Sequence, residues 1–300
     1  MELLALFVTV LGPILALITL GYAITRPLAL EAHTLSRLIY YILIPAFIIE
    51  AIGRAEMGLG TALRFVALTL LWQGACALLA LLVARLRRAP APLAGAYVLV
   101  AVFGNAGNFA LPVITFHLGE GAKSAAALGF LVVNIVGFAV GLAAARAVHG
   151  GRGTLLSALR TPALVAVLPA LLLRLLGWEL PLALGRALAL LSEALVPVML
   201  LTLGVQLALA GRIRLTADVA LMSALRLVAG PLAALALLLV LPLPPAERGA
   251  ALIHASTPIA IITSVIALEH ELAPELVTAA VLLSTLLSPL TLTVVLALAG

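Results

Sequence analysis

The stretch Val102–Ile114, "VFGNAGNFALPVI", places two glycines, two asparagines and a proline inside an apolar run. Gly104 and Gly107 weaken a helix because glycine loses more backbone freedom on folding than any other residue. Pro112 lacks an amide hydrogen, and its ring opposes the carbonyl four residues earlier. A break in a helix at membrane depth is tolerated only where protein or a water-filled cavity covers the freed backbone groups. The stretch therefore predicts a broken helix that lines a cavity, provided that the chain spans a membrane.

The composition is that of an integral membrane protein. The chain has 300 residues, of which 65% are hydrophobic and 10% are charged, whereas an ordinary soluble domain is roughly 25% charged. Its mean hydropathy is +1.30. The first apolar run follows Glu2 and has no small-residue cleavage site, so we expect a retained helix and not a signal peptide. The lone Cys76 lies in an apolar segment and allows no intramolecular disulfide.

Apolar segments long enough to cross a bilayer follow one another along the whole chain, which predicts one polytopic all-α domain with ten transmembrane helices. The predicted spans are residues 3–24, 33–52, 62–86, 93–118, 122–147, 155–176, 182–208, 216–240, 248–269 and 274–298. The short connections between them carry most of the charge.

The basic residues are distributed unequally between the two sides of the membrane. One side receives ten: Arg26, Arg37, Arg85, Arg87, Arg88, Arg146, Arg152, Arg160, Arg212 and Arg214. The other side receives six: Arg54, Arg64, Lys123, Arg174, Arg186 and Arg248. By the positive-inside rule the first side is cytoplasmic. We therefore expect a multi-pass protein of the cell (inner) membrane with both termini extracytoplasmic.

The two halves of the chain share a pattern of prolines. Pro45 and Pro112 interrupt the second and fourth spans, and Pro197 and Pro258 interrupt the seventh and ninth. Five spans per half is an odd number, so a duplicated half enters the membrane from the opposite side. The pattern predicts two inverted five-helix repeats, residues 1–149 and 154–300. The alternative explanation is that prolines are simply frequent in transmembrane helices.

The ninth span contains a second predicted break, "HASTPIAIITS" (residues 254–264). Ser256 and Thr257 are good N-cap residues, and Pro258 suits the first position of a second half-helix. Asn105 and Asn108 in the other break carry amides that can cap a helix and also meet a ligand. Both second half-helices would direct free amide hydrogens and a positive dipole end into the break. Such a site favours an anion, and a carboxylate is its natural occupant.

Three segments carry a family resemblance: "FGNAGNFALPVI" (103–114), "ALGFLVVNIVGF" (127–138) and "TPIAIITSVIALEHELAPELVTAAVLLSTLLSPLTL" (257–292). They resemble the auxin efflux carrier family, which includes bacterial carriers of malonate and related acids and is related to the bile-acid/sodium symporters. The resemblance implies that spans 1, 2, 6 and 7 form a scaffold and that spans 3–5 and 8–10 form a transport domain. It also implies that the crossing broken helices 4 and 9 hold the substrate, that the transport domain moves like an elevator, and that the protein forms a homodimer.

Arg226 lies well inside a predicted span, where an arginine costs at least ~2.5 kcal/mol on insertion scales. Two interpretations stay open, a counter-charge for an acidic substrate or carboxylate, and a side chain that snorkels or caps a carbonyl. Glu50 and Glu193 can each carry a coupled proton or be structural. Asn134 is another candidate for substrate binding because it precedes the small-residue pair Gly137 and Gly141.

The candidate substrate-binding residues are therefore Asn105, Gly107, Asn108, Pro112, Asn134, Ser256, Thr257 and Pro258, with Arg226 and Glu50 as candidates for charge or coupling. The sequence contains no enzyme, ATPase or metal-binding motif, and no cofactor is expected. We expect a secondary carrier of small organic anions, either auxin-like monocarboxylates or malonate-like dicarboxylates, with H⁺ or Na⁺ as a possible coupling ion. The alternative is a membrane sensor or scaffold that binds a ligand without transporting it.

Overall fold

A computed structural model describes residues 7–53, 57–149, 161–178, 180–210 and 215–299. This described part of the chain consists of helices joined by turns and short non-helical segments, with one isolated β-bridge and no strand. Five of the arginines used above for orientation, Arg54, Arg152, Arg160, Arg212 and Arg214, lie outside it.

Seven described helical segments are long and apolar enough to cross a membrane, which agrees with a multi-pass membrane protein. They are η1–α2 (Phe7–Leu11, Gly12–Thr25), α3–η2–α4 (Ala32–Leu38, Ile39–Leu43, Ile44–Gly53), α5 (Leu59–Leu86), η4–α8 (Glu120–Ala122, Lys123–His149), α10 (Leu182–Leu209), α11–η6–α12 (Ala217–Ala224, Leu225–Ala229, Gly230–Leu238) and α15 (Pro274–Ala299). The other three predicted spans contain shorter helices: α6 (Ala91–Val102) with η3–α7 (Ala106–Ala110, Leu111–Leu118), α9 (Pro162–Leu176), and α13 (Pro245–Ser256) with α14 (Ile262–Glu269). The count of ten spans stays a prediction.

Prolines locally widen several helices without ending them. The four π-helical turns η1, η2, η3 and η6 each end two residues before a proline, namely Pro13, Pro45, Pro112 and Pro231. A proline ring clashes with the carbonyl four residues back and offers it no amide hydrogen. A π-turn relieves this clash because its hydrogen bonds span five residues.

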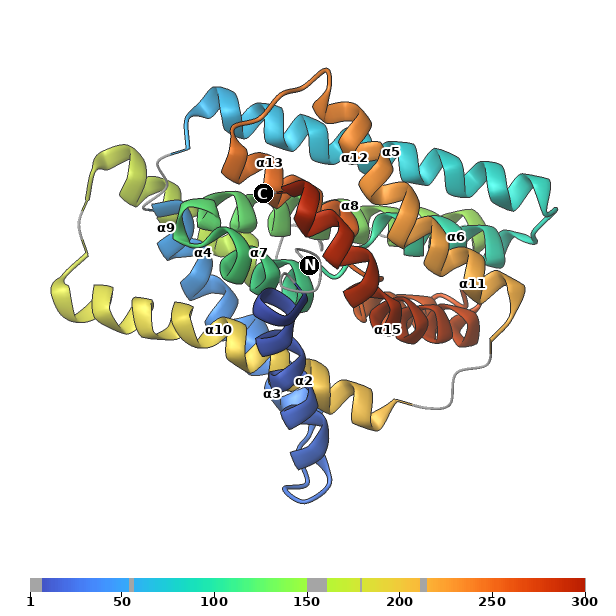
Figure 1. The fold of residues 1–300 in the computed structure, drawn as a ribbon, viewed down its shortest axis with the longest axis horizontal. Helices are drawn as coiled ribbons and strands as arrows, with labels where there is room; N and C mark the ends of the chain where they lie inside the picture. Colours follow the sequence, from blue (N-terminus) through green and yellow to red (C-terminus); the bar gives the residue numbers. More distant parts are fainter. Residues whose placement is uncertain (1–6, 54–56, 150–160, 179, 211–214, 300) are drawn as a thin grey trace.

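The helices pack as two groups. Helix α2 packs against α10 and α4 against α9, while α5, α6, α8 and α11 to α15 pack mainly on one another. In Figure 1 the first group lies along the left side and the bottom, and the second group fills the centre, the top and the right. Contacts of α10 with η3 and of α4 with α8 join the two groups.

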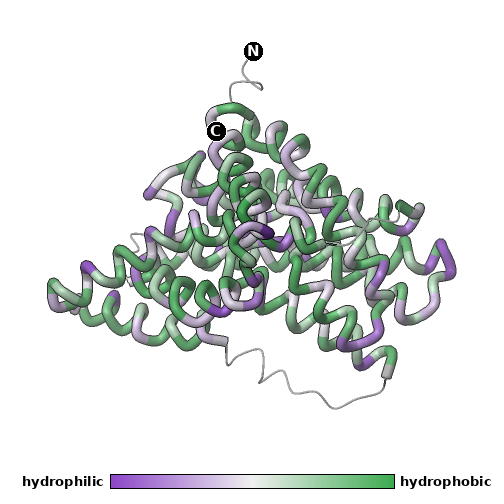
Figure 2. Tube along the Cα trace, turned by 90° about the horizontal axis from the view of Figure 1, so that it is seen from below, coloured by the Kyte–Doolittle hydropathy of each residue, from purple (hydrophilic) through white to green (hydrophobic). Residues whose placement is uncertain are grey.

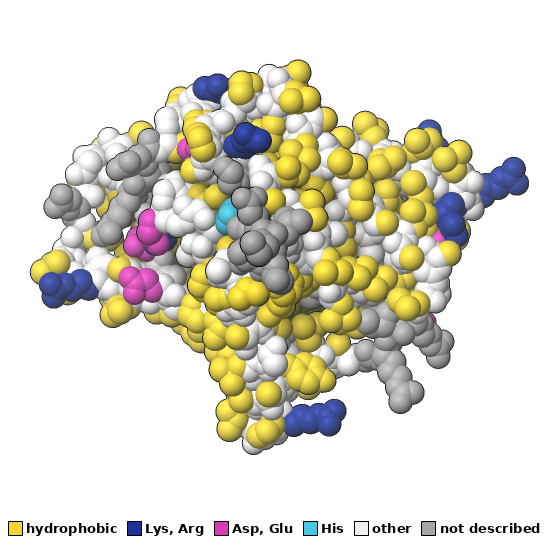
Figure 3. Space-filling view, viewed as in Figure 1, with side chains coloured by type: hydrophobic (Ala, Val, Ile, Leu, Met, Phe, Trp, Pro, Cys, Tyr) yellow, Lys and Arg dark blue, Asp and Glu magenta, His cyan; other side chains and the backbone are white. Residues whose placement is uncertain are grey.

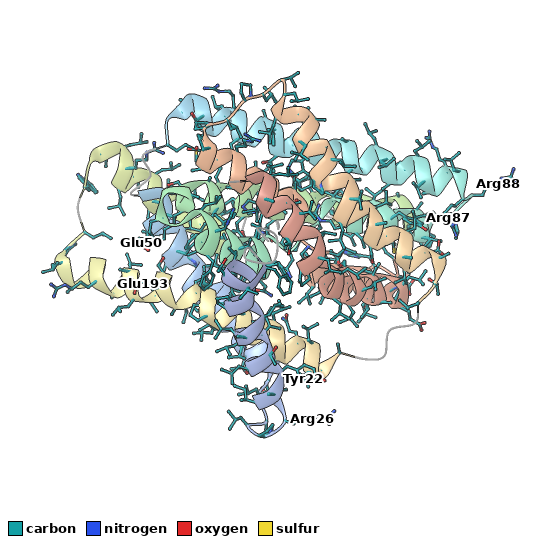
Figure 4. The ribbon with its side chains drawn as sticks, viewed as in Figure 1. Tyr22, Arg26, Glu50, Arg87, Arg88 and Glu193 are labelled. Atoms are coloured by element: carbon teal, nitrogen blue, oxygen red, sulfur yellow. The ribbon has the colours of Figure 1, made fainter. Side chains whose placement is uncertain are left out.

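The surface is largely apolar, as expected for a protein that is surrounded by lipid. Figure 2 shows hydrophobic residues along most of each helix and hydrophilic residues mainly at turns and helix ends. Large side chains such as Leu78 and Leu239 are exposed, and in Figure 3 the charged side chains lie mostly near the rim of the face. Figure 4 places Arg26 at the bottom, Arg87 and Arg88 at the right, and Glu50 at the left. A lipid environment accounts for this apolar surface, because few soluble proteins expose so much of it.

Two glycines allow α2 and α10 to touch backbone to backbone. A Cβ atom at Gly204 would overlap the carbonyl oxygen of Ile18, and one at Gly21 would overlap that of Leu201. Small residues allow this close approach between membrane helices, where packing replaces the hydrophobic effect as the main source of attraction.

We predict that Gly204→Ala destabilises the protein, because the new methyl group must push α2 and α10 apart. Overpacking of this kind typically costs ~1–3 kcal/mol. The thermal midpoint of the detergent-purified protein should fall. Gly185→Ala is the matched control, since Gly185 lies in the same helix and a Cβ there meets nothing within 4 Å. Equal midpoints for the two variants would contradict the prediction.

Candidate functional site: two crossing helix breaks and a groove

The two predicted breaks exist, and they lie against each other. The chain leaves helical geometry between α6 and η3 at Phe103–Asn105, and between α13 and α14 at residues 257–261. The backbone amide of Asn105 donates to the Pro258 carbonyl at 2.8 Å, and the backbone amide of Ala260 donates to the Phe103 carbonyl at 2.9 Å. These bonds form an antiparallel bridge between Gly104 and Ile259. Each break therefore supplies hydrogen-bond partners for the backbone groups that the other break frees.

The structure corrects the predicted roles of both prolines. Pro112 does not cause the first break but lies in α7, where the π-turn η3 absorbs its clash. Pro258 does not begin a half-helix, because α14 begins at Ile262 with Ile261 as its N-cap. Pro258 instead lies within the crossing and accepts the hydrogen bond from Asn105.

Ser256 and Thr257 belong to the end of α13 and are not N-caps of α14, contrary to the prediction. The Ser256 hydroxyl donates to the Leu252 carbonyl at 2.6 Å, and the Thr257 hydroxyl donates to the His254 carbonyl at 3.1 Å. Both side chains are fully buried. They complete the carboxyl end of α13 and do not line the groove described below.

Arg226 binds the carboxyl ends of both first half-helices. Its Nε donates to the Thr257 carbonyl at 2.9 Å, and Nη2 donates to the His254 carbonyl at 2.9 Å and to the Thr257 hydroxyl at 3.1 Å. Its Nη1 donates to the Ala101 carbonyl at 3.3 Å. The side chain is fully buried, with Cζ 5.1 Å from the centroid of the Trp72 ring. Of the two open interpretations, the structure shows the carbonyl cap.

The crossing forms part of the wall of a groove with a volume of about 570 Å³. Its wall is made by the two breaks and by one face each of α3–η2, α8 and α10. The lining includes the aromatic side chains of Tyr40, Tyr41, Phe103, Phe130 and Phe138.

Four of the predicted binding residues line this groove, namely Asn105, Gly107, Asn108 and Asn134. The side-chain oxygen of Asn105 accepts the Asn108 amide at 3.1 Å, so Asn105 caps η3 as an asparagine at a break is expected to do. Its Nδ2 is buried and has no hydrogen-bond partner in the described part of the chain. Asn134 donates to the Phe130 carbonyl at 2.7 Å within α8. The side-chain amide of Asn105 is thus a hydrogen-bond donor without a partner among the described residues.

Several lining residues were not identified from the sequence, because the predicted site was built on the helix breaks and these residues lie outside the two breaks. His33, Ser36, Arg37 and Tyr40 recur on one face of α3–η2, and Met199, Thr202 and Gln206 recur on one face of α10. Their spacing of three and four residues is the signal that identifies one side of a helix. Grouping the residues of these two spans by helix face would have identified both sets.

Glu50 lies away from the groove and pairs with Lys123 at 3.1 Å. The adjacent Ser124 hydroxyl donates to the Ala51 carbonyl at 3.0 Å. Both contacts join α4 to the start of α8, at the end of α4 that is distant from Ser36 and Arg37. Glu50 also lines a separate recess with Arg174 and Arg186.

Comparisons with known proteins show similarity to membrane transporters. A family model described as "Membrane transport protein" matches residues 146–296. An "Uncharacterized transporter" of Methanothermobacter thermautotrophicus is 28% identical over 283 residues, which is 92% of this chain and 92% of that protein. The chain belongs to this membrane transport protein family, the auxin efflux carriers, and is a membrane transporter.

Proposed function

We propose that the protein is a secondary carrier of organic anions that binds the substrate carboxylate at the two crossing breaks. The observation that carries this proposal is the groove, in which the amino ends of η3–α7 and α14 both form part of the wall. A helix amino end carries a partial positive charge and free amide hydrogens. Two such ends beside the unpartnered Nδ2 of Asn105 make a site suited to a carboxylate.

The packing supports an inverted repeat of five plus five spans. In such a repeat α2 corresponds to α9, and α4 corresponds to α10. The pair α2 and α10 therefore corresponds to the pair α9 and α4, and both pairs are packed. In the same way, α5 corresponds to α12 and α6 corresponds to α13. Helix α5 contacts α6, and α12 contacts α13. Residues 1–149 and 154–300 are therefore proposed as the two repeats, with the crossing at their interface.

The lining favours an amphipathic monocarboxylate over a small dicarboxylate. Aromatic and aliphatic side chains form most of the wall, and Arg37 is its only arginine or lysine among the described residues. No Asp or Glu of the described chain lines the groove. Such a wall suits one carboxylate on an apolar body, whereas a second carboxylate would lie against apolar side chains and lose its hydration.

The position of the groove supports an elevator-type mechanism. The groove lies where α3–η2 and α10, of the proposed scaffold, face the crossing and α8, of the proposed transport domain. At the other end of α4, Glu50 and Ala51 contact Lys123 and Ser124 across the same boundary. In a carrier that is open to one side, the scaffold and the transport domain touch at the closed end and leave a groove between them at the open end. With the orientation predicted above, that side is the cytoplasm, and a homodimer would form through the scaffold helices.

The first experiment is uptake into proteoliposomes. We predict saturable uptake of an aromatic monocarboxylate such as indole acetate and weak uptake of malonate, because the groove offers one arginine and an apolar wall. Ligand-driven counterflow of labelled acid separates a carrier from a binding protein. Preference for malonate would contradict the proposed substrate class, and absence of counterflow with either acid would contradict the assignment as an organic-anion carrier.

We predict that Asn105→Asp lowers uptake by about tenfold or more, since one lost hydrogen bond to a charged group is worth ~1.5–3 kcal/mol. The substitution keeps the oxygen that caps η3 but exchanges the free amide donor for an acceptor that repels an anion. Asn108→Ala should also impair uptake. Ser223→Ala is the control, because Ser223 does not line the groove and its hydroxyl binds the Val219 carbonyl of α11 and the Ala280 carbonyl of α15. Normal uptake by both asparagine variants, at normal yield of folded protein, would refute their role.

Movement of the transport domain can be tested by cross-linking. In a Cys76→Ala background, we predict that a short bifunctional thiol reagent blocks uptake when it joins Glu50→Cys to Lys123→Cys. The reason is that the link fixes α4 to α8. The control pair is Arg87→Cys with Asp218→Cys, whose native side chains pair at 3.1 Å within the proposed transport domain. If linking the first pair leaves uptake unchanged, α4 and α8 do not separate during transport.

A further inference from the structure

Arg226 is a buried positive charge without a counter-ion. Its hydrogen bonds go to three carbonyls and one hydroxyl, and in the described part of the chain it forms no ion pair. A charged side chain inside the membrane is costly, and when retained it commonly marks a functional site. The carbonyl cap explains how the charge is held there, but a neutral donor could also have satisfied these oxygens.

The oxygens that surround Arg226 form a site for a cation. Ala101, His254 and Thr257 lie at the carboxyl ends of α6 and α13, where the helix dipoles are negative. Carbonyl and hydroxyl oxygens that converge in this way are the ligands that hard metal cations prefer. The guanidinium occupies that position permanently, because it belongs to the chain.

The guanidinium also lies directly behind the wall of the groove. A Cβ atom at Gly104 would overlap Nη2 and Cζ of Arg226, so the Gly104 backbone is in contact with the charge. Gly104 itself also lines the groove. One layer of backbone separates the charge from the proposed carboxylate position, and an interior of low dielectric screens the attraction only weakly.

We propose that Arg226 is the resident counter-cation of the anion site, in the place that a co-bound metal cation would otherwise take. This inference rests on the proposed function. A monoanion then neutralises the site on binding, and binding requires neither Na⁺ nor K⁺. Arg226 does not touch the substrate, so it is a positioning residue that acts through the field at the crossing.

The test compares one anion with a neutral molecule of the same shape. Arg226→Gln keeps an amide donor for the carbonyls and removes the charge. We expect its affinity for indole acetate to fall about ten- to hundredfold, because a charge interaction across one layer of backbone is lost, while its affinity for indole acetamide stays at the wild-type value. Arg87→Gln, which removes an equal charge from the partly exposed pair with Asp218, should change neither affinity. A purely structural role for Arg226 predicts equal losses for acid and amide, and that result would overturn the proposal.

The wild-type protein supplies a second test that does not depend on a folded variant. Uptake of indole acetate should be equal in media that contain Na⁺, K⁺ or N-methylglucamine, and a requirement for either metal ion would overturn the proposal. If the protein binds neither indole compound, the proposed function fails, but the cation site is still testable by thermal denaturation. The wild-type midpoint should be the same in all three media, and a specific increase in Na⁺ or K⁺ would show that the site is not already filled.

Discussion

At membrane depth every backbone amide and carbonyl needs a hydrogen-bond partner, and this constraint shapes the centre of the molecule. Two helices stop near each other, and each releases groups that water cannot reach. The antiparallel pairing around Gly104 and Ile259 satisfies part of this requirement. Arg226 satisfies much of the rest, and Ser284 accepts the Ile259 amide at 3.1 Å. The breaks are therefore stable only as a pair, supported by α11–η6–α12 and α15.

This arrangement separates the two kinds of helix end. The carboxyl ends of α6 and α13 turn toward Arg226, where a cation stabilises their negative dipoles. The amino ends of η3–α7 and α14 turn toward the groove. A single crossing thus holds the guanidinium against the carboxyl ends and leaves the amino ends beside the groove, where we propose that the anion binds. The anion preference proposed for the carrier follows from this separation and does not need a basic residue in contact with the substrate.

Prolines and glycines shape the surrounding helices for different purposes. The π-turns before Pro13, Pro45, Pro112 and Pro231 absorb local clashes and let the helices continue. Gly104 permits backbone contact with the Arg226 guanidinium, and Gly204 permits backbone contact between α2 and α10. The first contact builds the site, whereas the second stiffens the helices against which the site is proposed to move.

The sequence alone determined the membrane character, the presence of both breaks and the capping role of Asn105, because these depend on composition and on residues within one helical turn. It also named Asn105, Gly107, Asn108 and Asn134, which line the groove. Only the tertiary structure decided which way the other polar groups face. The partners of Arg226 are 28 to 125 residues away in the chain, so no local pattern shows that it binds carbonyls. Ser256, Thr257 and Pro258 were misplaced because their residue types suit a helix start. The hydroxyls of Ser256 and Thr257 bond instead to carbonyls three or four residues earlier in α13, and the long-range bond from the Asn105 backbone amide places Pro258 in the crossing.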